Sequence, residues 1–280
     1  MRNSHTFLDL DAQLRPHLPR EGTFDWLMNL DGNVYRHVKH RRTLEFEVGG
    51  RRYFIKIHRG CGWGEIFKDL ISARPPIVSA RSEWEAIERL QRIGIRTMKV
   101  AGRGERGANP AERESFVITE TLENMISLEE LTQQWSVWPR RVRENVKRAL
   151  LEQIAGMAKT MHRHGLNHRD FYLCHFLLTA RAFENWNSKE DLDLHLIDLH
   201  RMQHRRRVPL RWRVKDLASL LHSSLDAGLT RRDLVRFVRL YGGKPWSRLD
   251  ARSKKRWRRI WRHAHRLYLG FHKRTPPSLR

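Results

Sequence analysis

Cysteine and long apolar runs are scarce in this sequence, and each scarcity excludes a class of protein. The 280 residues contain two cysteines, Cys61 and Cys174, which form no C-x-x-C pair and cannot build a disulfide framework. We therefore expect a reducing, cytoplasmic compartment. No apolar run approaches the roughly 20 residues that a membrane-spanning helix needs. Residues 1–11 mix charged and apolar side chains, unlike the apolar core of a secretory signal.

Acidic residues are also few, at 31 Asp and Glu against 55 Lys and Arg, which gives a formal net charge of +24. Such a field attracts polyanions, including nucleic acid, anionic lipid, phosphorylated glycan and acidic protein. Because no aromatic RNA-binding strand is present, nucleic acid is not an expected partner. The hydrophobic fraction of 40% is too high for a disordered chain, and the length suits one large domain or two lobes.

A strand-rich region follows a preamble over residues 7–30 that we interpret as helical. Residues 43–48 alternate polar and apolar side chains, Gly49-Gly50 predicts a hairpin turn, and residues 51–58 return as a second strand. This second strand turns Lys56 inward, where a charge must be paired.

A helix over residues 82–90 offers three acids to Lys56, at Glu83, Glu85 and Glu88. Glu83 opens the helix just ahead of its apolar face, so it is the expected partner; each acid could instead be solvated. The intervening residues 58–66 carry three alternate glycines, which predict either a phosphate-cradling loop or a turn, with no helix opening after them.

The second half of the chain predicts helices. We place the division near Glu123, giving an N-lobe of residues 1–123 and a C-lobe of residues 124–280. An apolar stripe predicts a long core helix after Pro139. Residues 254–273 alternate cations with aromatic and aliphatic residues, which predicts a helix docked on the second lobe or, alternatively, a helix lying on anionic lipid.

Two carboxylates mark the expected chemistry. His168-Arg169-Asp170 precedes a short apolar strand, with the possible metal ligand His175 five residues after Asp170, and Asp198 ends another apolar strand. This arrangement suits phosphoryl transfer, in which one carboxylate orients the attacking hydroxyl and accepts its proton while the other holds the metal–nucleotide.

The order of these residues resembles the protein-kinase-like fold: α+β and bilobal, with a strand-rich N-lobe and a helical C-lobe. Four segments are more specific and resemble the lipopolysaccharide core heptose kinases, the WaaP/RfaP family. These segments are residues 53–56, 83–87, 115–120 and 167–176.

The resemblance implies phosphorylation, by ATP with Mg²⁺, of the first inner-core heptose of lipopolysaccharide at its 4-hydroxyl. The expected place is the cytoplasmic face of the inner membrane, with peripheral association to anionic lipid. The acceptor is a lipid-anchored, phosphorylated glycan, which gives the positive charge a target. An acidic protein such as acyl carrier protein is a further expected partner.

Roles follow position by position from the resemblance. Asp170 is implied as the base, Lys56 as the phosphate ligand held by Glu83, and the backbone of Glu120 and Leu122 as the adenine contact. Asp198 is implied as the magnesium ligand, and Asp216 as the brace of the catalytic loop.

The sequence also departs from the kinase pattern. His175 stands where protein kinases carry a metal-binding Asn, and imidazole is a poor magnesium ligand. Leu199-His200 follows Asp198 in place of the usual Phe-Gly, and the glycine-rich first hairpin is replaced by a basic one.

Two alternatives stay open at the level of sequence. One is a kinase-like phosphotransferase acting on another hydroxyl, such as a protein tyrosine or another sugar; the positive charge disfavours a cationic aminoglycoside. The other is a catalytically silent basic scaffold, against which the intact Lys56, Asp170 and Asp198 count.

Overall fold

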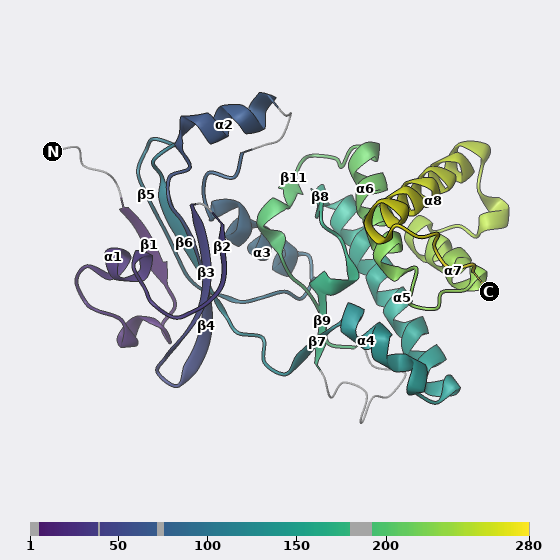
Figure 1. The fold of residues 1–280 in the computed structure, drawn as a ribbon, viewed down its shortest axis with the longest axis horizontal. Coiled ribbons are helices and arrows are strands. Elements are labelled where there is room, and N and C mark those ends of the chain that lie inside the picture. Colours follow the sequence, from purple (N-terminus) through teal and green to yellow (C-terminus); the bar gives the residue numbers. More distant parts are fainter. Residues whose placement is uncertain (1–5, 39, 72–75, 180–191, 280) are drawn as a thin grey trace. The chain divides into compact units, whose positions relative to one another are not determined.

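A computed structural model describes residues 6–38, 40–71, 76–179 and 192–279, which form two compact units (Figure 1). Unit 1 comprises Met1–Arg89, Met98–Leu122 and Leu199–Arg201. Unit 2 comprises Leu90–Thr97, Glu123–Asp198 and Met202–Arg280. The domain limits 1–123 and 124–280 remain a prediction.

Unit 1 is built on a six-stranded antiparallel sheet in the order β1-β5-β6-β4-β3-β2. Its strands are β1 (Thr6–Leu10), β2 (Asn33–Val38), β3 (Arg41–Val48), β4 (Arg51–His58), β5 (Val100–Arg106) and β6 (Glu114–Glu120). The predicted hairpin of β3 and β4 is confirmed, with Gly49 and Gly50 at φ of 59° and 69°, as a tight turn requires. On β4, Tyr53, Ile55 and Ile57 are buried in the main core, so the alternation turns Lys56 to the opposite face.

The helical interpretation of residues 7–30 is wrong at its start. Residues 6–10 form β1, which pairs with β5, because alternate Leu8 and Leu10 pack against the core of the sheet. The helix of this region is α1 (Thr23–Met28).

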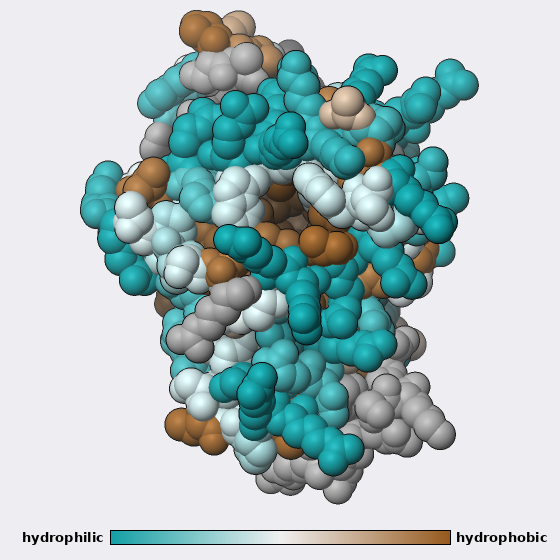
Figure 2. All heavy atoms as spheres, turned by 90° about the vertical axis from the view of Figure 1, so that its right-hand side faces the viewer, coloured by the Kyte–Doolittle hydropathy of each residue, from teal (hydrophilic) through white to brown (hydrophobic). Residues whose placement is uncertain are grey.

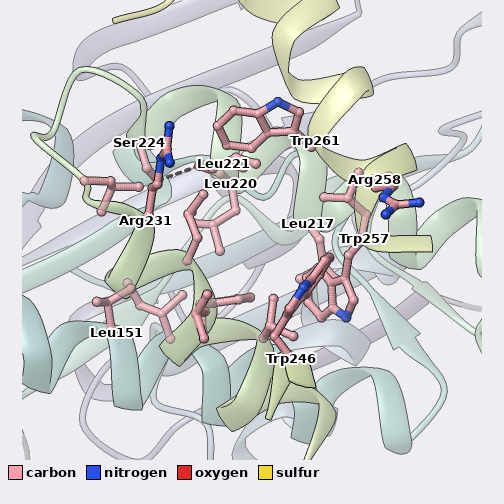
Figure 3. Close-up of a pocket in the computed structure, with 17 residues that line it drawn as sticks. Leu151, Leu217, Leu220, Leu221, Ser224, Arg231, Trp246, Trp257, Arg258 and Trp261 are labelled. Carbon is pink, nitrogen blue, oxygen red and sulfur yellow. Dashed lines mark hydrogen bonds between the residues drawn. The ribbon is translucent and has the colours of Figure 1, made fainter. Parts of the chain in front are cut away.

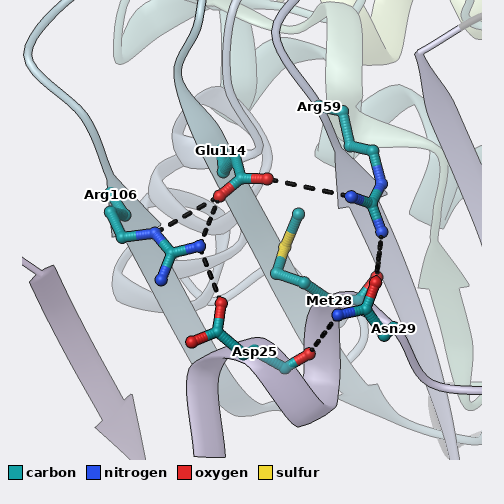
Figure 4. Close-up of polar contacts among 6 residues, drawn as sticks. All are labelled: Asp25, Met28, Asn29, Arg59, Arg106 and Glu114. Carbon is teal, nitrogen blue, oxygen red and sulfur yellow. Dashed lines mark hydrogen bonds and ion pairs between the residues drawn. The ribbon is translucent and has the colours of Figure 1, made fainter. Parts of the chain in front are cut away.

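Two arginines fix α1 to the sheet (Figure 4). Arg59 donates to Met28 O at 2.8 Å and to Asn29 Oδ1 at 2.9 Å. Arg106 bridges Asp25 at 2.8 Å and Glu114 at 2.6 Å. The hydrogen bond from Arg106 lowers the pKa of Asp25 below its ordinary value.

Two further helices complete unit 1. The predicted helix is present as α3 (Arg81–Arg92), where Trp84 packs with Ala80 and Val117 of the sheet. The expectation that no helix follows the alternate glycines is wrong, because α2 (Gly62–Ile71) starts among them.

Unit 2 is mainly helical, with two small sheets ordered β10-β9-β7 and β11-β8. Its strands are β7 (Met125–Ser127), β8 (Leu166–Asn167), β9 (Phe176–Thr179), β10 (Leu194–Leu196) and β11 (Gln203–His204). Its helices are α4 (Leu128–Gln134), α5 (Arg140–Arg163), α6 (Leu210–Ser224), α7 (Arg231–Gly242) and α8 (Ala251–His272).

The two long helices of unit 2 bury the apolar faces expected from the sequence. On α5, the buried apolar residues recur at helical spacing from Val146 to Met161. On α8, Ile260, Ala264 and Tyr268 are buried and the helix packs on α6. The docked interpretation of this segment is therefore confirmed, whereas contact of the helix with anionic lipid stays a prediction. No helix in the described parts of the chain is long and apolar enough to cross a membrane.

Candidate active site

In unit 1, the structure brings Lys56 and Glu83 together. Lys56 Nζ on β4 lies 2.5 Å from Glu83 Oε1 in the first turn of α3. The Glu83 side chain is 1% exposed and that of Lys56 is 28% exposed, so the pair has a buried anionic end and a more accessible cationic end. The ammonium can donate three hydrogen bonds, of which Glu83 takes one. The pair therefore holds the Lys56 ammonium at the more exposed end of a contact whose carboxylate is buried.

The other two unit 1 candidates lie where β6 ends. Glu120 pairs through its side chain with Lys99 at 2.5 Å, and its backbone N–H donates to Lys99 O at 3.0 Å. Two residues later, the half-buried Leu122 is the last residue of this segment of unit 1. The Lys99 pair fixes the strand end from which an adenine contact would come.

In unit 2, a buried carboxylate holds the segment before Asp170. Asp216 on α6 is 0% exposed, and its two oxygens accept the backbone N–H groups of His168 and Arg169, each at 2.8 Å. The predicted bracing role of Asp216 is thereby confirmed. Arg169 has φ of 77°, a costly conformation for a non-glycine residue, and the hydrogen bond to Asp216 offsets part of that cost.

Two histidines extend this network. His162 Nε2 lies 3.1 Å from Asp216 Oδ2, and its Nδ1 lies 2.9 Å from the Tyr241 hydroxyl. Burial raises the pKa of Tyr241 to about 12, so the phenol stays protonated. His168 Nε2 donates to Ile197 O at 3.0 Å, and burial lowers the pKa of His168 so that its ring is neutral. The His168 bond joins the segment before Asp170 to the strand end that carries Asp198.

His175 lies between the two candidate carboxylate residues. Its Nδ1 is 2.6 Å from Asp170 O and must donate, because a carbonyl oxygen only accepts. Its Nε2 is 3.4 Å from Asp198 Oδ2. The ring thus links the backbone of one candidate residue to the carboxylate of the other, and the structure brings all three together within unit 2.

The donor set at Asp198 fits a magnesium ion that arrives with a nucleotide. Mg²⁺ is usually held by one or two carboxylates together with phosphate oxygens and water. Among the described residues, no group of three or more His, Cys, Asp or Glu side chains is placed to hold a metal ion by itself. Asp198, with φ of 61° and a partly exposed carboxylate, would supply the hard oxygen, whereas His175 offers a softer nitrogen. His175 suits the orientation of Asp198 better than the binding of magnesium.

Sequence reasoning missed the second layer of this site. His162 contacts Asp216 and Tyr241 contacts His162, but these residues lie far apart along the chain, so no local sequence pattern predicts the contacts. Trp212 was missed too, and its ring lies 5.2 Å from the Arg169 guanidinium and 5.7 Å from that of Arg205. A tryptophan near the start of a helix rich in cations was the available signal.

A separate apolar cavity of about 330 Å³ lies in unit 2, between α5, α6, α7 and α8 (Figure 3). Leu217 and Leu220 on α6 face Trp257 and Trp261 on α8 across it, with Arg231 at its edge. Figure 2 shows hydrophobic side chains within a hollow on the face that carries α7 and α8, surrounded by hydrophilic ones. The cavity has the chemistry of a site for an aliphatic group.

Comparison with known proteins decides the family, since the model of the lipopolysaccharide kinase (Kdo/WaaP) family matches residues 25–241. The chain belongs to this family. The lipopolysaccharide core heptose(I) kinase WaaP of Pseudomonas aeruginosa is 50% identical over 222 residues, which cover 79% of this chain and 81% of that protein. The protein of the same name from Escherichia coli K12 is 48% identical over 223 residues, covering 79% and 82%.

The present chain also matches a solved structure of WaaP in complex with acyl carrier protein, with a TM-score of 0.78 and 40% sequence identity. The match covers 94% of the present chain and 99% of the solved one. The fold is therefore α+β and protein-kinase-like, as expected, and the protein is a kinase of lipopolysaccharide core synthesis.

Proposed function

We propose that this protein transfers the γ-phosphate of ATP to the first heptose of the lipopolysaccharide inner core, at the 4-hydroxyl, on the cytoplasmic face of the inner membrane. The observation that carries the proposal is the 50% identity, over 79% of the chain, to a relative named as the heptose(I) kinase. The presence of Lys56, Glu83, Asp170 and Asp198 in the order typical of kinases supports it.

Each residue has a proposed task. Asp170 accepts the proton of the heptose hydroxyl and aims that oxygen at phosphorus. Lys56, held by Glu83, binds the nucleotide phosphates, and the backbone of Glu120 and Leu122 contacts the adenine edge. Asp198 holds magnesium, which when bound would neutralise charge on the transferring phosphoryl group. His175 orients Asp198, with direct metal ligation as its alternative task.

The buried network behind the loop supports these assignments. Catalysis of phosphoryl transfer depends on positioning and electrostatics rather than on covalent chemistry by the protein. Asp216 fixes two consecutive amides immediately before Asp170, and His168 and His175 tie that loop to the Asp198 segment. The backbone carbonyl of Asp170 and the carboxylate of Asp198 therefore both have contacts with His175 that require no metal.

Acyl carrier protein is the proposed partner of unit 2. Support comes from a structure of WaaP in complex with acyl carrier protein, at 40% identity to this chain. Exposed cations on α8 would attract an acidic surface, and the apolar lining of the cavity beside α8 suits an acyl chain.

The kinase assignment is tested by label transfer from [γ-³²P]ATP and Mg²⁺ to inner-core lipopolysaccharide that lacks its heptose phosphate. We expect label in this acceptor, none in an otherwise identical acceptor without heptose, and none with Asp170→Ala. NMR of the product then assigns the phosphorylated hydroxyl. A folded, ATP-binding protein that labels neither acceptor contradicts the substrate, and labelling of a tyrosine peptide alone favours the other phosphotransferase.

A further inference from the structure

The helix α2 exposes a continuous apolar face. The exposed fractions are 51% for Trp63, 55% for Phe67, 54% for Leu70 and 87% for Ile71. These positions recur at i, i+4, i+7 and i+8, the spacing of one helical face. Among the α2 side chains that the structure describes, Ile66 alone is buried, at 5% exposure.

The apolar residues of α2 are grouped rather than scattered. The rings of Trp63 and Phe67 lie 5.8 Å apart, and Figure 1 shows α2 along the outer margin of unit 1. Single exposed apolar residues are ordinary, but a contiguous apolar patch on a soluble domain usually marks an interaction site. The face of α2 therefore calls for a partner.

The surroundings of α2 favour a lipid surface as that partner. Trp and Phe are suited to the boundary between headgroups and acyl chains. The cationic residues Arg41 and Arg59 line the same small pocket as Glu65 and Ile66 at the start of the helix. At ten residues, α2 is about 15 Å long, too short to span a bilayer and suited to lying in its interface.

The alternative lipid-binding helix is not available in the same way. On α8, the apolar residues Ile260, Ala264 and Tyr268 are buried against unit 2. Its cations can attract anionic lipid, but the buried part of its apolar face cannot enter a bilayer without undocking. In contrast, α2 already presents four large apolar side chains to solvent.

We propose that α2 is a membrane-docking helix whose exposed face, Trp63, Phe67, Leu70 and Ile71, enters the interface of an anionic bilayer. Docking holds the kinase at the surface that carries its acceptor; this purpose rests on the proposed function, whereas the binding itself does not. The energy comes from removing apolar side chains from water, with cations adding a salt-sensitive attraction.

Vesicle sedimentation of the full-length chain tests the proposal. The vesicles contain phosphatidylcholine and phosphatidylglycerol, without lipopolysaccharide, so the result does not depend on the acceptor. The test variant is Phe67→Ser/Ile71→Ser. The control is Phe271→Ser/Val137→Ser, which removes another phenylalanine and another β-branched side chain that are 77% and 86% exposed, both in unit 2.

We expect the vesicle partition coefficient of the α2 variant to be at least about tenfold lower than that of the wild type, because two apolar side chains no longer insert into the bilayer. The control should stay within about twofold of the wild type. Ile71→Ser alone, at the most exposed position, should give a smaller decrease with an unchanged thermal melt. Equal partitioning of the α2 variant and the wild type overturns the proposal.

Two further measurements distinguish membrane docking by α2 from the proposed kinase function and from self-association through α2. On acceptor embedded in vesicles the α2 variant should turn over more slowly, while on de-acylated, water-soluble acceptor it should match the wild type. A wild type that binds vesicles but phosphorylates neither acceptor refutes the proposed function and leaves membrane docking supported. Self-association that disappears in the α2 variant, without vesicle binding by the wild type, overturns the inference in favour of an interface between copies.

Discussion

Glu83 is 1% exposed and forms an ion pair with Lys56, and its Oε2 is buried without a hydrogen-bond partner among the described residues. Replacing Lys56 by Met leaves an uncompensated buried carboxylate, which should lower the free energy of unfolding by about 2 kcal/mol, less than for a fully buried pair because Lys56 is partly exposed. The double variant Lys56→Met/Glu83→Gln should regain most of that stability in urea denaturation. Both variants should lose turnover, since neither has a cation for the phosphates; full activity in the double variant would refute the role of Lys56.

Asp170 should affect the chemical step far more than binding. Asp170→Asn keeps the shape of the side chain but removes the base, so we expect kcat to fall about a hundredfold or more. The dissociation constant of ATP, measured by calorimetry, should change less than about threefold. Asn is the sharper test than Ala because it preserves packing; a kcat near wild type would move the role of base to another residue.

His58 makes the stability of unit 1 depend on pH. Burial, followed by the charges of Arg41 and Lys56, lowers the pKa of His58 from 6.5 to about 3. The unfolded chain therefore binds a proton below pH 6.5 that the folded chain refuses, so stability is present above that pH and is lost as pH falls toward 3. By linkage, the loss from pH 7.5 to pH 5 is about 2 kcal/mol.

The variant His58→Phe should lack this part of the pH dependence. Urea unfolding of the wild type and the variant, at pH 7.5 and at pH 5, gives the difference between their two losses. Equal losses of stability in both proteins would show that the folded chain does bind a proton at His58 at pH 5, so that burial does not lower its pKa.

Local patterns in the sequence were sufficient for several of these residues. Alternation on β4 predicts an inward Lys56, and the start of a helix predicts Glu83, because both depend on the period of one element. The contact of His162 with Asp216 could not be predicted from spacing, since it depends on how α5 packs on α6. The apolar spacing of Trp63, Phe67 and Ile71 was present in the sequence, but the glycines beside it favoured a phosphate-cradling loop or a turn over the helix that the structure shows.

At the scale of elements, α5 and α7 are joined by a buried ion pair. Lys147 Nζ lies 3.1 Å from Asp233 Oδ2, with side chains 6% and 5% exposed. Asp233 also forms the capping box of α7 with Thr230. Burial alone would raise the pKa of Asp233, but its hydrogen bonds with Thr230 and Lys147 outweigh that effect and lower it.

Asp233→Asn should therefore destabilise unit 2 by about 3 kcal/mol, through loss of the ion pair and weakening of the cap. Thr230→Ala, which removes only the cap, should cost about 1 kcal/mol. Because the folded pKa of Asp233 is depressed, its stabilisation is present above the unfolded pKa and is lost as the pH falls through the folded one. In thermal melts, the difference in melting temperature between the wild type and Asp233→Asn should be smaller at pH 3 than at pH 7. An equal difference at both pH values would exclude the ion pair as the cause.

At the scale of the whole molecule, the formal charge of +24 governs association with acidic partners. Exposed cations on α8 include Arg259 and Arg262, neither of which has an acidic partner among the described residues. The proposed docking of acyl carrier protein on unit 2 should therefore depend on salt. The Debye length falls from about 10 Å at 0.1 M to about 3 Å at 1 M, so exposed charges on the two proteins are progressively screened.

We expect the dissociation constant for purified acyl carrier protein to rise at least about tenfold between 0.05 and 0.5 M NaCl, as measured by calorimetry. Arg259→Glu/Arg262→Glu should weaken binding at low salt by a similar factor. Arg20→Glu/Arg36→Glu makes the same change in net charge on exposed residues of unit 1, so it separates a docking surface from the general field. If both pairs weaken binding equally, the long-range charge attracts the partner and α8 does not receive it; if only the α8 pair does, the acidic protein docks on unit 2.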